Sequence, residues 1–122
     1  MAFSFFIEMK ITKVKENYLF RRAYKKAPSY VCPYAVVYIL KNRGAGVRLG
    51  ITAGKKLGKA VKRNRAKRVI TAAFSECLPK ISGNFDFIIV ARSRILTTKS
   101  TTVQKCFEKI FLKAKVYGDG HE

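Results

Sequence analysis

Acidic residues are scarce in this chain. Only 7 of its 122 residues are Asp or Glu, whereas 26 are Lys or Arg, so the formal net charge is +19. Repulsion among so many positive charges destabilises a compact state, and a polyanionic partner relieves it. Nucleic acid is the commonest partner of this kind, so the charge balance favours a nucleic-acid-binding protein.

Cysteine and histidine are also rare. Cys32, Cys77 and Cys106 are odd in number and widely spaced, and His121 is the only histidine of the chain. This pattern supports neither a disulfide framework nor a zinc site. We expect three reduced thiols with structural roles, as in a cytoplasmic protein.

The residues of a hydrolytic active site are lacking as well. A metal-dependent nuclease holds Mg²⁺ with clustered carboxylates, whereas Glu76, Asp86 and Glu108 are scattered along the sequence. A general acid–base nuclease relies on histidines, and His121 lies in a Gly-Asp-Gly-His-Glu tail that we expect to be frayed. The sequence therefore predicts neither a catalytic residue nor a metal ligand.

Long apolar runs are missing too. The longest such stretch covers residues 34–40, which is far short of the roughly 20 residues that span a bilayer. The first residues, MAFSFFIE, lack the basic start and the small-residue cleavage site of a signal peptide. We expect a cytoplasmic protein with no membrane partner.

The basic residues that are present concentrate in one region. Fifteen Lys or Arg and no acidic residue lie between Glu16 and Glu76, and eight of the fourteen residues over 55–68 are basic. A basic run is often only a solvated helix face, but a face that serves solubility usually mixes both signs of charge. The absence of acidic residues therefore favours a binding surface.

Apolar residues make up 48% of the chain, enough for a domain of this size to bury a core. Their spacing predicts an α+β fold in which helices pack on one mostly antiparallel sheet. The expected elements are a helix over 16–26, a strand over 30–40 split by Pro33, a strand over 47–54, a helix over 59–78, a strand over 85–91 and a helix over 101–115.

The helix over 59–78 separates apolar from basic positions. At 100° per residue, five side chains share the arc that faces the sheet: Ala66, Ile70, Ala73, Phe74 and Cys77. Asn64, Arg65 and Arg68 point outward together, and Arg63 is expected to reach past the sheet edge. The helix follows a GKKLG turn (54–58), so backbone amides, ammonium groups and guanidinium groups would meet a phosphate backbone together.

The segment KKLGKAVKRNRAKRVITAAF (55–74), between VRLGIT and FDFIIVAR, resembles the bacterial ribonuclease P protein subunit. That family is marked by an Arg-Asn-Arg segment in a helix after a Lys-Lys-x-Gly turn, and the similarity extends over about residues 11–115. The resemblance implies a cofactor of a catalytic RNA that removes the 5′ leader of precursor tRNA. It also implies a ribosomal-protein-type α-β-β-β-α-β-α two-layer sandwich with a left-handed β-α-β crossover.

Two groups of site residues follow from the resemblance. The implied contacts to the RNA subunit are Lys55, Lys56, Lys59, Arg63, Asn64, Arg65, Lys67 and Arg68. The implied cleft for the 5′ leader is lined by Phe20, Tyr24, Val36 and Tyr38. Aromatic rings suit an unpaired strand because each stacked base contributes about 1–3 kcal/mol without requiring a particular sequence. Ordinary core packing is the alternative for the cleft residues, and it is weakest for Tyr38, whose hydroxyl needs a polar or wet site.

The same resemblance fixes the expected partners. They are the catalytic RNA subunit and precursor tRNA, with no DNA, and the chain takes part in an endoribonuclease whose chemistry belongs to the RNA. We expect no cofactor bound tightly by the protein and Mg²⁺ held with the RNA. The domain is expected to cover residues 1–122, with an N-terminal extension over 1–10 and a flexible tail over 116–122.

Two other functions stay open at this point. A ribosomal or other structural RNA-binding protein would share the basic composition and the fold without any role in cleavage. A standalone endonuclease is the weaker alternative, and it would require the purified protein to cut RNA without an RNA partner.

Overall fold

A single mixed sheet organises the part of the chain that the computed structural model describes, residues 28–41, 44 and 46–118. Its strands are β1 (Ser29–Val31), β2 (Ala35–Lys41), β3 (Val47–Thr52) and β4 (Phe85–Ala91), in the order β1-β2-β4-β3. The α-helices are α3 (Ala60–Cys77) and α4 (Ser100–Ala114), and the short 3₁₀ helices are η1 (Lys55–Leu57), η2 (Leu78–Lys80) and η3 (Ser93–Thr97).

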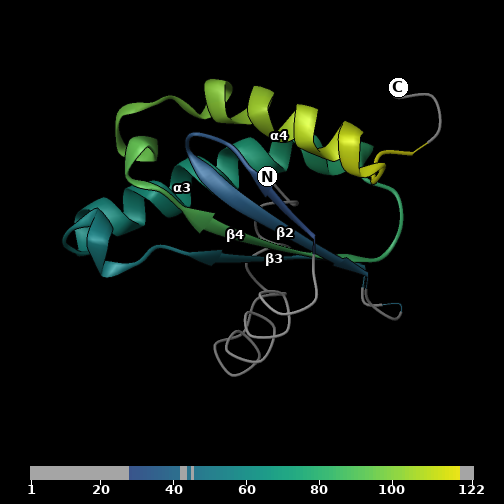
Figure 1. Ribbon diagram of the computed structural model, residues 1–122, viewed down its shortest axis with the longest axis horizontal. Helices are drawn as coiled ribbons and strands as arrows, with labels where there is room; N and C mark the ends of the chain where they lie inside the picture. Colours follow the sequence, from purple (N-terminus) through teal and green to yellow (C-terminus); the bar gives the residue numbers. More distant parts are fainter. Residues whose placement is uncertain (1–27, 42–43, 45, 119–122) are drawn as a thin grey trace.

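The sheet is mostly antiparallel, as predicted. Strand β2 pairs antiparallel with β1 and β4, whereas β3 and β4 are neighbours that run parallel. Parallel neighbours need a crossover connection, and α3 supplies it. Both α-helices cover the same face of the sheet (Figure 1), which confirms the two-layer α+β sandwich. The helix predicted over 16–26 lies outside the described residues.

Each strand follows from its residue pattern. In β2, Val37 and Ile39 are buried under the helices, whereas Val36 and Tyr38 are half-buried and alternate with them on the opposite face. Strand β4 is buried over four consecutive residues from Asp86 to Ile89, as expected for a central strand that is covered on both faces.

Helix α3 buries the five residues that its spacing predicts: Ala66, Ile70, Ala73, Phe74 and Cys77. It ends where η2 begins, and Pro79 lies within that 3₁₀ turn, because a proline cannot continue the helical hydrogen-bond pattern. The small residues of the buried arc let the helix lie close to the sheet, while its basic positions stay at the surface.

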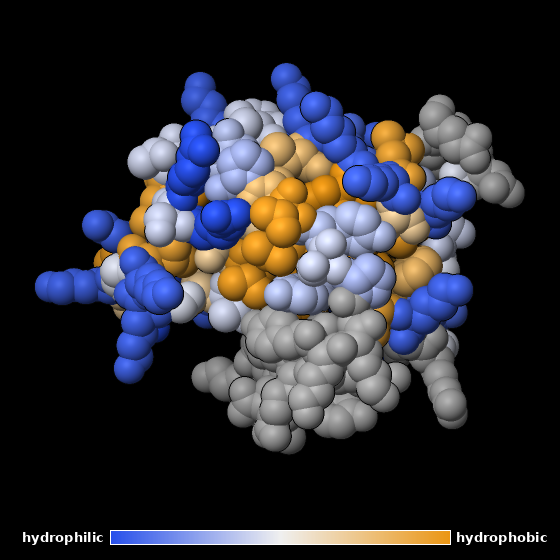
Figure 2. Space-filling view, in the orientation of Figure 1, coloured by the Kyte–Doolittle hydropathy of each residue, from blue (hydrophilic) through white to orange (hydrophobic). Residues whose placement is uncertain are grey.

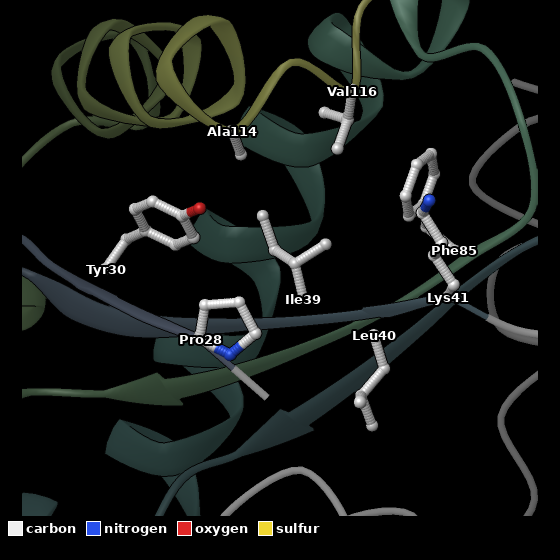
Figure 3. A pocket seen from close by; sticks show the side chains of 8 residues that line it. All are labelled: Pro28, Tyr30, Ile39, Leu40, Lys41, Phe85, Ala114 and Val116. Atoms are coloured by element: carbon white, nitrogen blue, oxygen red, sulfur yellow. The ribbon is translucent and has the colours of Figure 1, made fainter. Parts of the chain in front are cut away.

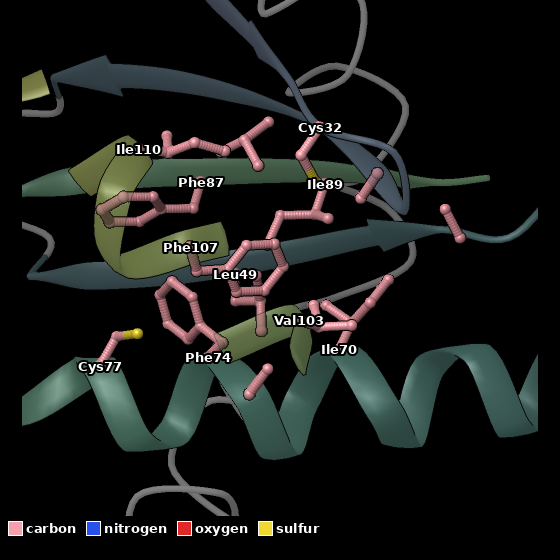
Figure 4. Close-up of a cluster of buried hydrophobic side chains, with 14 of the residues drawn as sticks. Cys32, Leu49, Ile70, Phe74, Cys77, Phe87, Ile89, Val103, Phe107 and Ile110 are labelled. Carbon is pink, nitrogen blue, oxygen red and sulfur yellow. The ribbon is translucent and has the colours of Figure 1, made fainter. Parts of the chain in front are cut away.

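Four phenylalanines form the centre of the core, which Figure 4 shows between the sheet and the two helices. The ring of Phe87 on β4 lies 5.1 Å from the rings of both Phe74 on α3 and Phe111 on α4, measured between centroids. Phe107 contacts Phe111 at 5.8 Å. The two pairs made by Phe87 are edge-to-face, and such pairs contribute about 0.5–1.5 kcal/mol beyond the burial of their apolar area. The cluster therefore fixes α3 against both the sheet and α4.

The end of the domain differs from the prediction, because residues 116–118 are not a flexible tail. Val116 is buried, Tyr117 forms a β-bridge with Ile81, and the Gly118 amide donates to the Lys80 carbonyl at 2.9 Å. The glycine-rich end of the sequence favours a frayed tail, but the side chains of Val116 and Tyr117, directly before it, pack on the core. No helix of the described chain combines the length and apolar character that a bilayer-spanning segment requires.

Candidate nucleic-acid interface

The basic turn that precedes α3 has a defined backbone path. Leu57 is buried and anchors η1, while the Gly58 amide donates to the Lys55 carbonyl at 3.0 Å. Gly58 has φ 118°, ψ −156°, a conformation that is essentially restricted to glycine. Because Leu57 points inward, Lys55 and Lys56 are left exposed at the start of the basic surface.

The first turn of α3 carries no negative charge. Lys59 is its N-cap residue, with no side-chain hydrogen bond to the helix and no acidic residue in the first turn. The first four backbone N–H groups at such an end lack helical partners, and the helix dipole adds a partial positive charge there. Cations four residues apart, such as Lys59 and Arg63, also repel each other. An anion bound at this end would accept hydrogen bonds from the free N–H groups, offset the partial positive charge of the helix dipole and reduce the repulsion between the cations.

Seven of the eight side chains predicted to contact RNA are exposed. They are Lys55, Lys56, Lys59, Asn64, Arg65, Lys67 and Arg68. Arg63 is half-buried, and its Nε lies in the interior without a hydrogen-bond partner among the described residues. That Arg63 reaches past the sheet edge stays a prediction. Lys62, which was not among the predicted residues, is exposed as well, and it belongs to the same basic run.

One residue of the Arg-Asn-Arg segment makes a contact within the protein. The Arg65 Nε donates to the Leu96 carbonyl of η3 at 3.2 Å, which is the long end of the range for an N–H···O bond. A guanidinium has five N–H donors, so this bond leaves the others available. Helix α3 is thereby tied to a segment about thirty residues further along the chain.

These cations are not neutralised by the described carboxylates. Within residues 28–41, 44 and 46–118, the ion pairs are Arg48–Asp86 and Lys80–Glu108. Neither pair involves the basic residues of η1 or α3. Figure 2 shows hydrophilic side chains projecting from the end of the molecule where Figure 1 places η1 and the start of α3. The surface is therefore cationic, and no carboxylate of the described residues compensates its charge.

The predicted cleft residues of β2 lie on the sheet face opposite the helices. Tyr38 is paired in register with Ile88 of β4, and Val36 is paired with Val90. Both Val36 and Tyr38 are half-buried, so each presents part of its side chain on that face. Phe20 and Tyr24, the other two predicted cleft residues, lie outside the described residues.

The same face carries an ion pair that sequence reasoning missed. Arg48 and Asp86 are register partners on β3 and β4, and their side chains form two hydrogen bonds of 2.7 Å. The bond to Asp86 raises the pKa of Arg48. A signal was present in the sequence, because Arg48 and Asp86 are charged positions within otherwise apolar strands. Asp86, an acidic residue that is isolated in the sequence, therefore has a structural partner in the fold.

An apolar pocket of about 280 Å³, with no predicted site residue in its lining, lies under the end of α4 (Figure 3). Its lining residues are Pro28, Tyr30, Ile39, Leu40, Lys41, Phe85, Ala114 and Val116.

The three cysteines are free thiols. The described residues contain no group of three or more His, Cys, Asp or Glu side chains placed to hold a metal ion.

A family model for ribonuclease P matches residues 9–115, which include the strands, the basic turn and the Arg-Asn-Arg helix. The chain belongs to the ribonuclease P protein family. The ribonuclease P protein component of Thermoanaerobacter sp. (strain X514) is 32% identical over 108 residues, which cover 88% of this chain and 93% of the relative. That of Clostridium botulinum (strain Loch Maree / Type A3) is 34% identical over 110 residues, covering 89% and 99%.

Solved ribonuclease P proteins share the fold. The structure of the Staphylococcus aureus RNase P protein matches with a TM-score of 0.73 at 36% identity, over 88% of this chain and 96% of that one. The RNase P protein from Thermotoga maritima matches with a TM-score of 0.67 at 26% identity, over 81% and 92%. The resemblance predicted from the motifs is thus confirmed, together with the fold class that it implied.

Proposed function

We propose that this ribonuclease P protein is the cofactor of a catalytic RNA and binds that RNA through the basic surface of η1 and α3. In this role it acts in the cytoplasm and promotes endonucleolytic removal of the 5′ leader from precursor tRNA. The observation that carries the proposal is the row of exposed cations on α3 without a described carboxylate partner. Crowded phosphates of a folded RNA would neutralise that row.

The asparagine within the row supports RNA as the partner. Asn64 is exposed between two arginines, and its amide can both donate and accept hydrogen bonds. A ribose 2′-hydroxyl or a base edge offers the matching groups, whereas a phosphate only accepts. Arg65 and Arg68 would then neutralise phosphates, and Asn64 would hydrogen-bond a ribose 2′-hydroxyl or a base edge.

The second part of the proposal concerns the substrate. Val36 and Tyr38 present partly exposed side chains on the sheet face opposite the helices, and we place the 5′ leader there with Phe20 and Tyr24. An aromatic ring contributes to binding of an unpaired strand through stacking, with little demand on sequence. Only precursor tRNA has the leader, so this contact would distinguish precursor from mature tRNA.

The chemistry is assigned to the RNA. Two of the described acidic residues are engaged within the protein, Asp86 by Arg48 and Glu108 by Lys80 and Gln104. We propose that the protein binds no cofactor tightly and that Mg²⁺ ions are held with the RNA subunit. The basic surface would lower the repulsion between phosphates, so less Mg²⁺ is needed.

The test is reconstitution at low Mg²⁺. Purified protein, a bacterial ribonuclease P RNA and labelled precursor tRNA are mixed where the RNA alone cleaves slowly. We expect the protein to restore cleavage at the mature 5′ end and to cleave nothing without the RNA. Binding of the RNA with no gain in cleavage would contradict the cofactor role and favour a structural RNA-binding protein.

A further inference from the structure

The segment that joins β4 to α4 carries a second group of cations. Its sequence over 92–99 is RSRILTTK, and no acidic residue occurs between Asp86 and Glu108. Arg92, Arg94 and Lys99 are all exposed. We name these three residues the η3 cations.

The fold brings the η3 cations beside the basic surface of α3. Ile95 is fully buried and Leu96 packs against the core, so η3 is anchored in place. The Leu96 carbonyl accepts the 3.2 Å hydrogen bond from the Arg65 Nε. Figure 1 shows η1, η3 and the first turns of both α-helices at the same end of the molecule. Residues about thirty positions apart in sequence thus form one surface.

The η3 cations are as uncompensated as those of α3. The two ion pairs of the described chain lie elsewhere, at Arg48–Asp86 and Lys80–Glu108. The Arg92 Nη1 donates to the Cys32 carbonyl at 3.5 Å, a contact that leaves its positive charge in place. Two groups of like charges packed together destabilise the fold unless a polyanion lies across them.

We propose that the η3 cations form a second wall of the RNA-binding surface and contact the phosphate backbone of the catalytic RNA. Arg65 is the positioning residue that holds this wall against α3. Cations that approach from two elements fit a folded RNA, because its packed helices present phosphates from more than one strand. This inference rests on the proposed function and adds to it the contribution of residues outside the Arg-Asn-Arg helix.

The first experiment compares two variants that each lose two positive charges. Arg92→Ala/Arg94→Ala removes part of the second wall, whereas Lys109→Ala/Lys113→Ala removes two exposed lysines from α4. Affinity for a bacterial ribonuclease P RNA is measured between 50 and about 200 mM salt. We expect the slope of log affinity against log salt to fall by about 1.4–1.8 in the η3 variant, at about 0.7–0.9 per phosphate contact. The α4 variant should keep the wild-type slope.

The second experiment tests the role of Arg65 by a double-mutant cycle. If Arg65 positions η3, the loss of affinity from Arg94→Ala is smaller in the Arg65→Ala background than in the wild type. Additive losses would show that Arg65 is an independent phosphate contact and would overturn the positioning role. Thermal unfolding of each variant identifies any loss that is due to instability alone.

The outcomes separate this inference from the proposed function. Wild-type protein that restores cleavage, combined with an unchanged salt slope in Arg92→Ala/Arg94→Ala, overturns the second wall and leaves the cofactor role intact. Wild-type protein that fails to restore cleavage overturns the proposed function. Equal reductions of the slope in the η3 and α4 variants also overturn the inference, because they show a response to net charge alone.

Discussion

Arg48 and Asp86 face each other across the parallel strands β3 and β4 and are joined by two hydrogen bonds of 2.7 Å. The two-bond fork is the strongest geometry available to this pair of side chains. Asp86 is 4% exposed and is the one buried charged residue among those described. Because β3 is an edge strand, the pair ties the first half of β3 to the central strand β4.

Asp86→Asn should lower the free energy of unfolding by about 3 kcal/mol, because it leaves a guanidinium without its anion. Glu108→Gln is the matched control, since the Lys80–Glu108 pair is longer, at 3.6 Å, and partly exposed. That change should cost less than about 1 kcal/mol. Urea unfolding measures both variants, and an equal cost for the two would contradict a dominant role for the buried pair.

Gly58→Ala should disturb the junction between η1 and α3. The φ of 118° at this residue strains any side chain, and an added Cβ would lie 2.8 Å from the Lys62 Cδ. We expect a loss of about 1–3 kcal/mol of stability and weaker binding of the RNA subunit.

Gly54→Ala serves as the control for that variant. Gly54 has φ −75°, and an added Cβ would meet no atom within 4 Å. Its stability should stay the same or rise slightly, since alanine restricts the unfolded chain more than glycine does. If Gly54→Ala weakened RNA binding as much as Gly58→Ala, the conformational explanation would be wrong.

Alkaline pH should destabilise the protein through Cys77. Burial raises the pKa of this thiol to about 11 from a reference of 9.0, and burial also raises the pKa of Tyr117. The folded chain therefore retains protons that the unfolded chain releases, so the free energy of unfolding falls as the pH rises from about 9 to about 11.

Denaturant unfolding at several pH values measures this effect. Cys77→Ala should show a shallower decline over the same range, because one of the groups with a raised pKa is gone, while Cys106 and Tyr117 remain. Identical pH profiles for the wild type and Cys77→Ala would exclude the thiol as a source of the effect.

Most of the sheet and the helices could be predicted because their signals are local. Strand β4 has the predicted bounds, and the five buried residues of α3 follow from helical spacing alone. The charged positions of Arg48 and Asp86 are visible in the sequence, but their pairing is not, because it depends on the register between strands that are far apart in sequence. A one-residue change of register would have separated them.

The candidate site was predicted in part for the same reason. The basic run over 55–68 is continuous in sequence, so its charge is visible without a structure. Of the η3 cations, Arg94 lies within the five-residue 3₁₀ helix, Arg92 directly precedes it and Lys99 is the N-cap of α4. No helical periodicity marks them in the sequence, and only the tertiary fold places this segment beside Arg65. The glycine-rich residues after Val116 and Tyr117 predict a flexible tail, but the packing of these two side chains decides their placement.

Tyr38→Ala should weaken binding of precursor tRNA to the reconstituted enzyme more than binding of mature tRNA. The loss of one stacking ring corresponds to about 1–3 kcal/mol, and mature tRNA lacks the leader that would make this contact. Tyr38→Phe keeps the ring and should retain most of the preference. Fluorescence binding titrations with both tRNAs provide the measurement, and equal losses for the two tRNAs would argue against the leader cleft.

The central claim is that exposed cations of α3 contact RNA phosphates, and the salt dependence of RNA binding tests it most directly. Arg68→Ala is compared with Lys109→Ala, an exposed lysine on α4, by titration of a bacterial ribonuclease P RNA at several salt concentrations. The account predicts that Arg68→Ala lowers the magnitude of the log–log slope by about 0.7–0.9, while Lys109→Ala leaves it unchanged. An unchanged slope for Arg68→Ala, or an equal change in both variants, would contradict it.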